Sequence, residues 1–596
     1  MTEFRVLNKS LPPKARHAAG LICVLAGWIY SYSGGGSPDA FQQIFFLGAL
    51  SAASLLFGLS ATNPLGTAAV LGGMFVMVMT PNPYLGGQIA GAAGLLLAVL
   101  ACHLGAHLQR KPEGLPWLLF ALVAAAFINA IEGLLQWFGL VGELYRWVVE
   151  PERRGVAFGV FRQTNLFATF LCVGSICTVW LVHQRRLTES MAWFLLLVSM
   201  FAVAASGSRT GLLEVLTLAV LGLLWRKQHA PAVTRLLVGQ SVILGIAQLT
   251  LSKAANWLEF EFVSGVERAA RMGMDARLTI WSNALDLIAE HPWLGWGWRE
   301  TVYGHYVTLF SHRYKDQMDN VHNLPLQLAV ELGLPVTIAF FGVVAWAALF
   351  AKPLRVDIVA ADKLVQPASD RQFAWAILLL IIGIHSMLEY PLWYAGFLFL
   401  TGLAIGYVLP VQNSERVSVT YGAWSKRIAK IVALGLILLA LIAWQQYANV
   451  LPIYKTPFTR DREARRAAMM AAITNASGSW LFKEQLDFAR LDLVEVTPQN
   501  AVEVRRLAEK LLHYSAEPRV IQSLLLSLWY LNDGVALQFH AERFCHAFPI
   551  AFQRWSQDYA NHPMFTAARR LPYGCLPPIP SEQGVLGVRF QLNIRR

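Results

Sequence analysis

Apolar runs of about 17 to 25 residues recur along the first three quarters of the chain, each long enough to cross a hydrocarbon layer roughly 30 Å thick. About thirteen such runs lie between residues 15 and 446. Inside a membrane, backbone polar groups need hydrogen-bond partners within the protein, and a helix provides them within one segment. The sequence therefore predicts an all-α fold, a polytopic helical membrane protein with about 12 to 13 transmembrane helices.

Composition and charge support a bilayer environment. Hydrophobic residues make up 56% of the 596 residues, charged residues only 14%, and the mean hydropathy is +0.45, which excludes an ordinary soluble enzyme. The net charge of +12 does not require nucleic acid, because basic pairs such as Arg185–Arg186 and Arg226–Lys227 fall in loops that alternation places in the cytoplasm. We expect a multi-pass protein of the bacterial inner membrane with the N-terminus inside and no nucleic-acid partner.

Polar segments divide the chain into two expected domains. Residues 1–450 would form a polytopic transmembrane catalytic domain with a large periplasmic loop at about 251–322, and residues 451–596 a helical periplasmic domain. An inside start and thirteen crossings place this tail outside. Two cysteines of the tail, Cys545 and Cys575, could form a disulfide there or remain free thiols.

The segment that enters the apolar run near residue 164 carries Arg162, Gln163 and Asn165. Polar groups at such a position are costly unless they are used. Arg162 could be an interfacial anchor or a ligand group, whereas Gln163 and Asn165 would need partners inside the helix bundle.

A second cation, Arg209, lies in the small-residue break 206–211, on the predicted outer side. Glycine and serine allow a tight turn whose backbone can approach a ligand closely, and a guanidinium can bind phosphate oxygens through paired hydrogen bonds. A plain helical hairpin turn is the alternative. Because the other short outer turns carry no cation, we favour a functional role for Arg209.

The long outer loop carries Arg277 at the start of an amphipathic stretch that includes Trp281. The pattern is typical of a helix that lies on the membrane, with tryptophans at the interface. An arginine in an aqueous loop is ordinarily only solvated, so Arg277 alone does not establish a site.

A histidine and a polar stripe mark the outer mouth of a later apolar run. His322 precedes the predicted helix, and Asn323, Gln327 and Glu331 follow at spacings of four, which puts three polar side chains on one helix face. A histidine at a helix start is often structural. Here the stripe must face the bundle interior or a cavity, which favours function.

Another outer turn holds His385, Glu389 and Tyr390 before Pro391. Tyr390 could belong to an interfacial aromatic belt, and His385 to the core, as readily as to a site. The sequence has no Walker, HExxH or GxSxG motif, so nucleotide hydrolysis, zinc chemistry and serine hydrolysis have no support. We expect no metal and no cofactor.

In their order and common outer placement, these motifs resemble the bacterial O-antigen ligase and polymerase (Wzy/WaaL) superfamily, especially its PglL-type pilin O-oligosaccharyltransferases. The match rests on the loop at 162–165, the break at 208–211, the segment 277–281, the helix start at 322–333 and the polar tail. The tail is similar to the additional C-terminal domain of the oligosaccharyltransferase branch.

The resemblance implies a glycosyltransferase that moves a glycan en bloc from a polyprenyl (undecaprenyl) diphosphate carrier to serine or threonine hydroxyls of pilin or another periplasmic protein, without ATP. It matches His322, Gln163 and Tyr390 to the family's functionally important residues. We assign a further set of residues to substrate binding, chiefly to binding of the diphosphate, because guanidinium groups form paired hydrogen bonds with phosphate oxygens. The set consists of Arg209, Arg277, Arg162, Asn165 and Asn323.

Three alternatives stay open from sequence. The acceptor could be lipid A core or a growing glycan, as in an O-antigen ligase or polymerase. A transporter or flippase of lipid-linked glycan is disfavoured, because the candidate residues gather at outer helix ends. A structural membrane scaffold gives no reason for Arg209 or for the polar stripe after His322.

Overall fold

The computed structural model describes residues 12–29, 38–60, 72, 80, 82–270, 275–351, 365–409, 418–455 and 462–558, and the regular structure within these residues is entirely helical. The chain divides into two compact units. The first comprises Met1–Thr301 and Met318–Leu493, and the second Val302–Gln317 and Val494–Arg596. The domain boundary expected near residue 450 falls inside α17 (Ser418–Tyr454), which belongs to the first unit.

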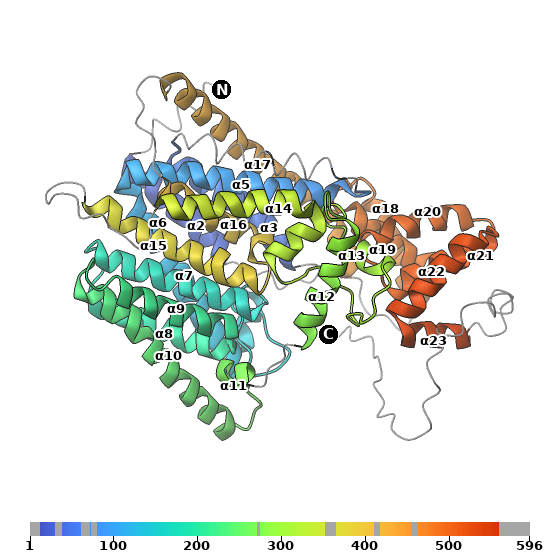
Figure 1. Ribbon diagram of the computed structural model, residues 1–596, viewed down its shortest axis with the longest axis horizontal. Coiled ribbons are helices and arrows are strands. Elements are labelled where there is room, and N and C mark those ends of the chain that lie inside the picture. Colours follow the sequence, from blue (N-terminus) through green and yellow to red (C-terminus); the bar gives the residue numbers. More distant parts are fainter. Residues whose placement is uncertain are drawn as a thin grey trace. The chain divides into compact units, whose positions relative to one another are not determined.

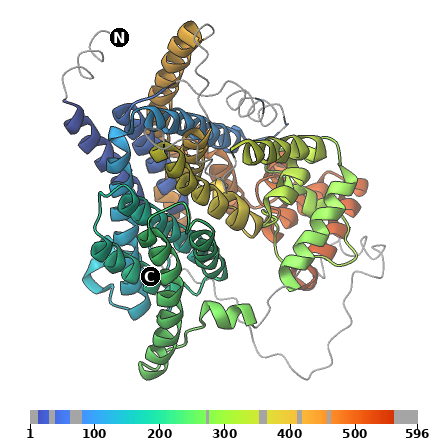
Figure 2. The same cartoon turned by 60° about the vertical axis from the view of Figure 1, so that its left-hand side comes forward.

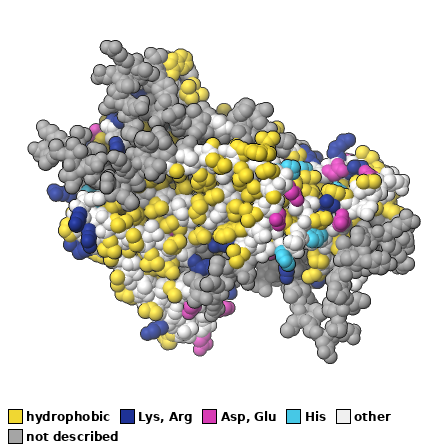
Figure 3. All heavy atoms as spheres, viewed as in Figure 1, with side chains coloured by type: hydrophobic (Ala, Val, Ile, Leu, Met, Phe, Trp, Pro, Cys, Tyr) yellow, Lys and Arg dark blue, Asp and Glu magenta, His cyan; other side chains and the backbone are white. Residues whose placement is uncertain are grey.

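The prediction of a polytopic helical membrane protein is confirmed. Among the described residues, eight helices are long and apolar enough to span a membrane. Figure 3 shows hydrophobic side chains over much of the visible surface of the helical bundle, with several Lys and Arg side chains at its left-hand end. One of the apolar runs of the sequence, residues 65–81, lies almost wholly outside the described residues. The eight spans are Ala40–Phe57, Leu85–Arg110, Pro112–Phe138, Thr164–His183, Glu189–Ser206, Pro231–Trp257, Leu324–Gly342 and Ala423–Tyr454.

The bundle of the first unit consists of two packed groups of helices, which meet where α2 packs on α6 and where α15 packs on α7 (Figures 1 and 2). One group contains α6 (Leu115–Phe138), α7 (Thr164–His183), α8 (Glu189–Ser206), α9 (Arg209–Leu224) and α10 (Pro231–Trp257). The other contains α2 (Pro13–Ile29), α3 (Pro38–Phe57), α5 (Leu85–Arg110), α15 (Val365–Leu378), α16 (Ala395–Val408) and α17. Nearly every residue of α7 is buried, so polar side chains on this helix face the protein interior.

Further elements complete the first unit. They are α11 (Gly265–Ala270), α12 (Asp275–Glu290), α14 (Leu324–Ala351), α18 (Arg462–Asn475) and α19 (Lys483–Leu493), with short 3-10 turns η1 (Pro112–Gly114), η2 (Gly142–Arg146) and η6 (Trp480–Phe482). The amphipathic helix expected after Arg277 is α12, which packs against α14. Its residues Leu278 and Leu285 are about half exposed, whereas Ala284 and Leu287 are buried.

A sharp kink divides α14 at Gly333, whose φ is +81° and ψ 167°. Pro335 has no N–H to give to the carbonyl of Glu331 four residues earlier. That carbonyl instead accepts the N–H of Gly297 at 2.9 Å, and the carbonyl of Val330 accepts the N–H of Trp296 at 2.8 Å. The kink thereby fixes the loop after α12 against the outer half of α14.

The second unit is a small helical domain that includes part of the outer loop. Its helices are α20 (Ala501–Leu512), α21 (Pro518–Tyr530), α22 (Gly534–Ala547) and α23 (Pro549–Asp558), and residues 302–317, which contain most of α13 (Thr301–Val307), pack with them. The ring of Tyr303 stacks on His513 with centroids 4.1 Å apart. Arg543 Nε donates to the carbonyl of Val307 at 2.8 Å, which caps the end of α13.

Hydrogen bonding inside the second unit also joins Tyr306 to His540, whose Nδ1 lies 3.0 Å from the hydroxyl. Burial, together with the charges of Arg543 and Arg505, lowers the pKa of His540 to about 4. The imidazole is therefore neutral at pH 7 and its Nδ1 can accept the phenolic proton. Cys545 is buried in this unit, and its suggested partner Cys575 lies outside the described residues.

The closest helix pair in the bundle is α5 with α16. A Cβ atom on Gly402 would clash with the carbonyl of Ala98, and one on Gly406 with the carbonyl of Cys102. Small residues four apart allow two membrane helices to approach until their backbones touch, and dispersion then holds them together.

We expect Gly402→Val to force α5 and α16 apart and to destabilise the protein by about 1–3 kcal/mol, as overpacking usually does. The midpoint of thermal unfolding in detergent measures this. Gly435→Val is the matched control, because a Cβ there meets no atom within 4 Å. Equal shifts in both variants would show that this close packing does not hold the bundle together.

Candidate active site

The carboxylate of Glu389 gathers side chains from three separate segments. Its Oε1 accepts hydrogen bonds from Arg277 Nη2 at 2.7 Å and from Asn165 Nδ2 at 3.2 Å, and its Oε2 lies 2.7 Å from His322 Nδ1. Arg277 lies at the start of α12, Asn165 in the first turn of α7, and His322 just before α14. Three of the residues proposed from sequence therefore meet at one acidic group.

The turn that presents Glu389 follows an irregular end of the helix before it. α15 continues as a π-helical stretch, η3 (Leu379–Ile384), and then as the 3-10 turn η4 (His385–Met387). π-helical segments are rare and occur frequently at functional sites. The N–H of Glu389 donates to the carbonyl of His385 at 2.8 Å, which fixes the position of the carboxylate relative to this turn.

Hydrogen bonding to Glu389 determines the tautomer of His322. A carboxylate oxygen only accepts, so Nδ1 carries the proton and Nε2 is the nitrogen left for chemistry. The His322 side chain is 30% exposed, which leaves the ring accessible. An imidazole held by a carboxylate with its other nitrogen free is the arrangement of a general base.

Burial alone would raise the pKa of Glu389. The hydrogen bond from His322 and the charges of His322, Arg277 and His385 outweigh burial and lower the pKa below its ordinary value. The carboxylate is therefore ionised at neutral pH, where it holds Arg277 in place and accepts the hydrogen bond from His322 Nδ1.

The loop before α14 holds His322 in a backbone conformation that non-glycine residues rarely adopt, with φ at +54°. Its N–H donates to Asn320 Oδ1 at 2.7 Å. The preceding Val321 is fixed on both sides, because its N–H donates to Gln327 Oε1 at 2.7 Å and its carbonyl accepts from Trp281 Nε1 at 3.1 Å. A rare φ that is so strongly supported is typical of a functional position.

Hydrogen bonds made by residues of the polar stripe hold this loop in place. Gln327 Nε2 donates to Glu331 Oε1 at 2.9 Å and to Thr301 Oγ1 at 3.0 Å. Asn323 Nδ2 donates to the carbonyl of Met387 at 3.1 Å, while its Oδ1 accepts the N–H of Leu326 at 3.1 Å. Asn323 thus joins the start of α14 to the turn that carries Glu389, and its contacts lie within the protein.

Arg209 stands next to this cluster at the N-terminus of α9. Ser208 Oγ accepts the N–H of Gly211 at 3.0 Å and donates to Asn165 Oδ1 at 2.6 Å, so Asn165 links α9 to Glu389. The N-terminus of a 16-residue helix carries a partial positive charge and favours anions. Arg209 itself is half-buried and makes no side-chain hydrogen bond or ion pair within the described part of the chain.

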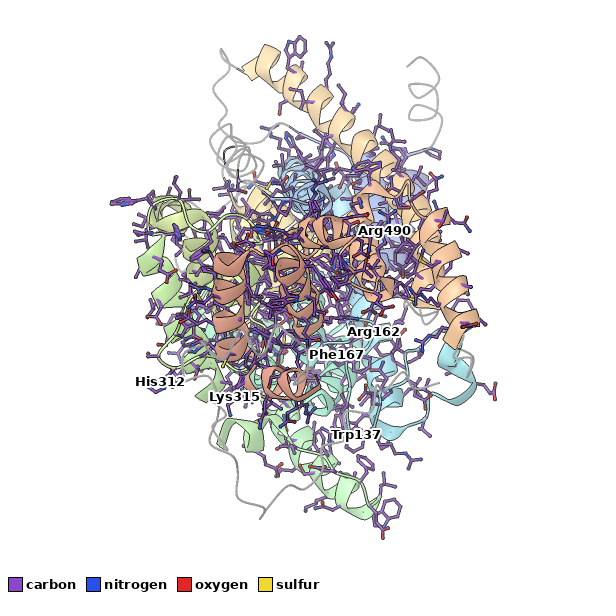
Figure 4. The ribbon with its side chains drawn as sticks, turned by 90° about the vertical axis from the view of Figure 1, so that its right-hand side faces the viewer. Trp137, Arg162, Phe167, His312, Lys315 and Arg490 are labelled. Atoms are coloured by element: carbon purple, nitrogen blue, oxygen red, sulfur yellow. The ribbon has the colours of Figure 1, made fainter. Side chains whose placement is uncertain are left out.

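The loop that carries Arg162 and Gln163 is fixed by two amides of α6. Gln136 Oε1 accepts the N–H groups of Phe158 and Gly159 at 2.9 and 2.8 Å, and Asn129 Oδ1 accepts that of Val160 at 3.2 Å. Arg162 is exposed and has a φ of +55°. It lies immediately before α7, whose first turn contains Phe167 (Figure 4).

Gln163 lies between Arg162 and the first turn of α7. Its Oε1 is buried and has no hydrogen-bond partner among the described residues. A buried acceptor without a partner needs an explanation, and a ligand hydroxyl would supply one.

Tyr390 lies directly against His322, with ring centroids 5.2 Å apart and planes inclined at 65°. The structure therefore brings together His322, Tyr390, Arg277 and Asn165 around Glu389, with Arg209 joined through Ser208. Sequence reasoning considered Glu389 only as a neighbour of Tyr390 and missed that it connects the site. The available signal was a carboxylate in an outer turn between two apolar runs.

A buried series of hydrogen-bonded polar side chains adjoins the site, and no sequence pattern indicated it. Thr169 Oγ1 on α7 donates to Glu214 Oε1 on α9 at 2.7 Å and therefore accepts from His385 Nδ1 at 2.6 Å. All three side chains are completely buried. They join α7 and α9 to the turn that presents Glu389.

We expect Glu389→Gln to lower stability in a pH-dependent way. Because the folded pKa of Glu389 is depressed, its ion pairs stabilise the protein above the unfolded carboxyl pKa of about 4.3, and this stabilisation is lost as pH falls through the folded value. The difference in unfolding midpoint between wild type and variant should be constant from pH 7 to about 5 and should shrink below about 4.

The control is Asp286→Asn on α12, whose exposed carboxylate makes no ion pair within the described residues. Thermal unfolding in detergent at a series of pH values gives the measurement. A difference for Glu389→Gln that did not change between pH 3 and 7 would contradict an ionised carboxylate as the source of the stabilisation.

Two protein families match this chain. The family described as O-Antigen ligase matches residues 192–341, and the one described as Virulence factor membrane-bound polymerase, C-terminal, matches residues 372–562. Arg209, Arg277 and His322 lie in the first match, and Glu389 and Tyr390 in the second. The two matches therefore cover most of the residues that meet at the site.

Two relatives come from Acinetobacter baylyi (strain ATCC 33305 / BD413 / ADP1). A General O-oligosaccharyltransferase is 27% identical over 347 residues, which cover 55% of this chain and 56% of the relative. A ComP-specific O-oligosaccharyltransferase is 22% identical over 389 residues, 64% of this chain and 65% of the relative. The chain thus spans less than two thirds of the length of either relative. The chain is thus similar over separate segments to the O-antigen ligase and membrane-bound polymerase families, and over just over half or more of its length to two O-oligosaccharyltransferases.

Proposed function

We propose that the chain is a glycosyltransferase that moves an oligosaccharide from a polyprenyl diphosphate carrier, most simply undecaprenyl diphosphate, to a hydroxyl group of a periplasmic protein such as pilin. The observation that carries the proposal is the cluster Arg277–Glu389–His322. Within the described part of the chain, His322 Nε2 and the nearby Arg209 side chain make no hydrogen bond or ion pair. The cluster and Arg209 together combine a base for a hydroxyl with cations for a diphosphate.

The chemistry needs little from the protein, because the donor is already activated. The acceptor oxygen forms a bond to the anomeric carbon while the bond from that carbon to the phosphate oxygen breaks, and the hydroxyl proton passes to His322 Nε2. The polyprenyl diphosphate leaves with the bonding electron pair. Direct displacement would invert the anomeric centre.

Charge on the departing diphosphate is the main feature that the site must stabilise. The guanidinium of Arg209 and the positive end of the α9 dipole favour it. Arg277 gives one N–H to Glu389 and keeps other donors of its guanidinium for the phosphate oxygens, and Arg162 contributes a further positive charge. Gln163 Oε1, which has no hydrogen-bond partner among the described residues, would accept a hydrogen bond from a hydroxyl of the acceptor or of the sugar.

A protein acceptor is favoured by the names of the two relatives, which are O-oligosaccharyltransferases. The family matches also include an O-antigen ligase and a polymerase. Transfer to lipid A core or to a second glycan is therefore the specific alternative, and it shares the donor and the proposed roles of the residues.

We expect purified wild type, given a polyprenyl diphosphate oligosaccharide and a pilin, to increase the pilin mass by one glycan. His322→Ala should lower the rate about 10²- to 10⁴-fold, as loss of a general base does. Arg209→Ala should lower it about 10²- to 10³-fold through loss of charge stabilisation. Mass spectrometry of the pilin measures both rates.

The matched control is Arg226→Ala, an exposed arginine just beyond the other end of α9, which should retain the wild-type rate. Transfer to lipid A core or chain extension, with none to any pilin, would move the chain to the ligase or polymerase alternative. Equal rates for wild type and His322→Ala would refute the proposed base.

We also propose that the site faces the periplasm of a bacterial inner-membrane protein. Lys227 lies in the short loop between α9 and α10, at the end of α9 opposite Arg209. Glu261 lies beyond the C-terminal end of α10, the end away from this loop. In a chain without native cysteines, a membrane-impermeant maleimide should label Glu261→Cys but not Lys227→Cys in cells whose outer membrane alone is permeable. The reverse pattern would contradict the periplasmic placement.

A further inference from the structure

An aromatic strip begins at His322. Tyr390 contacts His322, Trp393 lies 6.5 Å from Tyr390 at an angle of 82°, and Trp298 lies 5.9 Å from Trp393 with the two planes only 17° apart. These distances join ring centroids. All three rings of the strip Tyr390–Trp393–Trp298 are partly exposed.

The backbone holds this strip in place. Trp393 belongs to the 3-10 turn η5 (Pro391–Trp393), and its N–H donates to the carbonyl of Tyr390 at 3.2 Å. The N–H of Trp298 donates to Thr80 Oγ1 at 3.3 Å, and its carbonyl accepts from Asn82 Nδ2 at 3.4 Å. Trp298 also follows the two residues that bond to the kinked part of α14, so the ring has a rigid base.

An interfacial belt is the ordinary explanation for tryptophans in a membrane protein. Belt residues of this chain look different: Trp257 and Trp293 are 83% and 74% exposed and make no ring contact within the described residues. The strip is instead half-buried, its rings contact one another in series, and it begins at the proposed base. These features are typical of a ligand platform rather than of a membrane anchor.

The position of the strip relative to the reacting bond then indicates which ligand it binds. The anomeric carbon has the diphosphate on one side and the rest of the sugar on the other. Through Glu389 and Asn165, His322 is connected to Arg277 and the start of α9, where the diphosphate would bind. The uncharged strip begins at the ring of Tyr390, which contacts His322, so a sugar whose anomeric carbon is placed at His322 would lie next to these rings.

We propose that Tyr390, Trp393 and Trp298 form a subsite for successive sugar rings of the donor glycan, an assignment that rests on the proposed function. One face of a pyranose is lined with C–H groups and packs on an aromatic face, while its hydroxyls point to the sides. Arg299, the residue after Trp298, is 39% exposed and places one guanidinium nitrogen 3.5 Å from Glu484. Its other N–H groups can donate to such hydroxyls.

The experiment compares two donors, a polyprenyl diphosphate carrying a single sugar and one carrying an oligosaccharide, on wild type, Trp298→Leu and Trp393→Leu. With the oligosaccharide donor, we expect kcat/KM to fall about 5- to 10-fold in each variant, mainly through KM. With the single-sugar donor, Trp298→Leu should match wild type. Trp298→Phe and Trp393→Phe keep an aromatic face and should recover most of the loss.

Trp257→Leu is the matched control for removal of an exposed tryptophan, and thermal unfolding checks that each variant is folded. An equal loss with both donors, or no loss with either, would overturn the glycan subsite. Failure of wild type to transfer any glycan would instead overturn the proposed function, so the two failures are distinguishable. The phenylalanine variants keep the test valid if a leucine variant does not fold.

Discussion

The ionised carboxylate of Glu389 is the constraint on which the arrangement of the site depends. Only 8% of this side chain is exposed, and a buried charge is costly unless cations and hydrogen-bond donors surround it. Arg277, Asn165 and His322 meet that need from α12, α7 and the loop before α14. The interactions that stabilise this one acidic group therefore also bring together the elements that could bind a diphosphate and activate a hydroxyl.

Rigid support beneath the carboxylate keeps this geometry. The buried chain Glu214–Thr169–His385 joins two helices of the bundle to the turn of Glu389. On the other side, the kink at Gly333 exposes carbonyls of α14 that bind the loop leading to Trp298. Both devices place polar backbone or side-chain groups inside the protein, where low dielectric strengthens each hydrogen bond and makes its loss costly.

Sequence reasoning could predict features that are local along the chain. Apolar runs gave the membrane helices, and a polar break before an apolar run gave the starts of α9 at Arg209 and of α14 at Leu324. The helical character expected for the tail agrees with helices such as α20 (Ala501–Leu512). The contacts of Glu389 could not be predicted, because they join residues 67, 112 and 224 positions apart. Nor could the packing of residues 302–317 with the C-terminal helices, which depends on side-chain pairs such as Tyr306–His540 from distant segments.

Because only one of the two arginines is paired with a carboxylate, positive charge is distributed unevenly across the site. Glu389 neutralises Arg277, whereas Arg209 has no ion pair among the described residues and lies where the dipole of α9 adds to its charge. The positive charge that Glu389 does not balance is therefore at the start of α9, while the uncharged rings of Tyr390 and Trp393 begin at His322. A ligand that is anionic at one end and neutral at the other would bind in one orientation only, because the reversed orientation would place its anion on aromatic rings and leave Arg209 uncompensated.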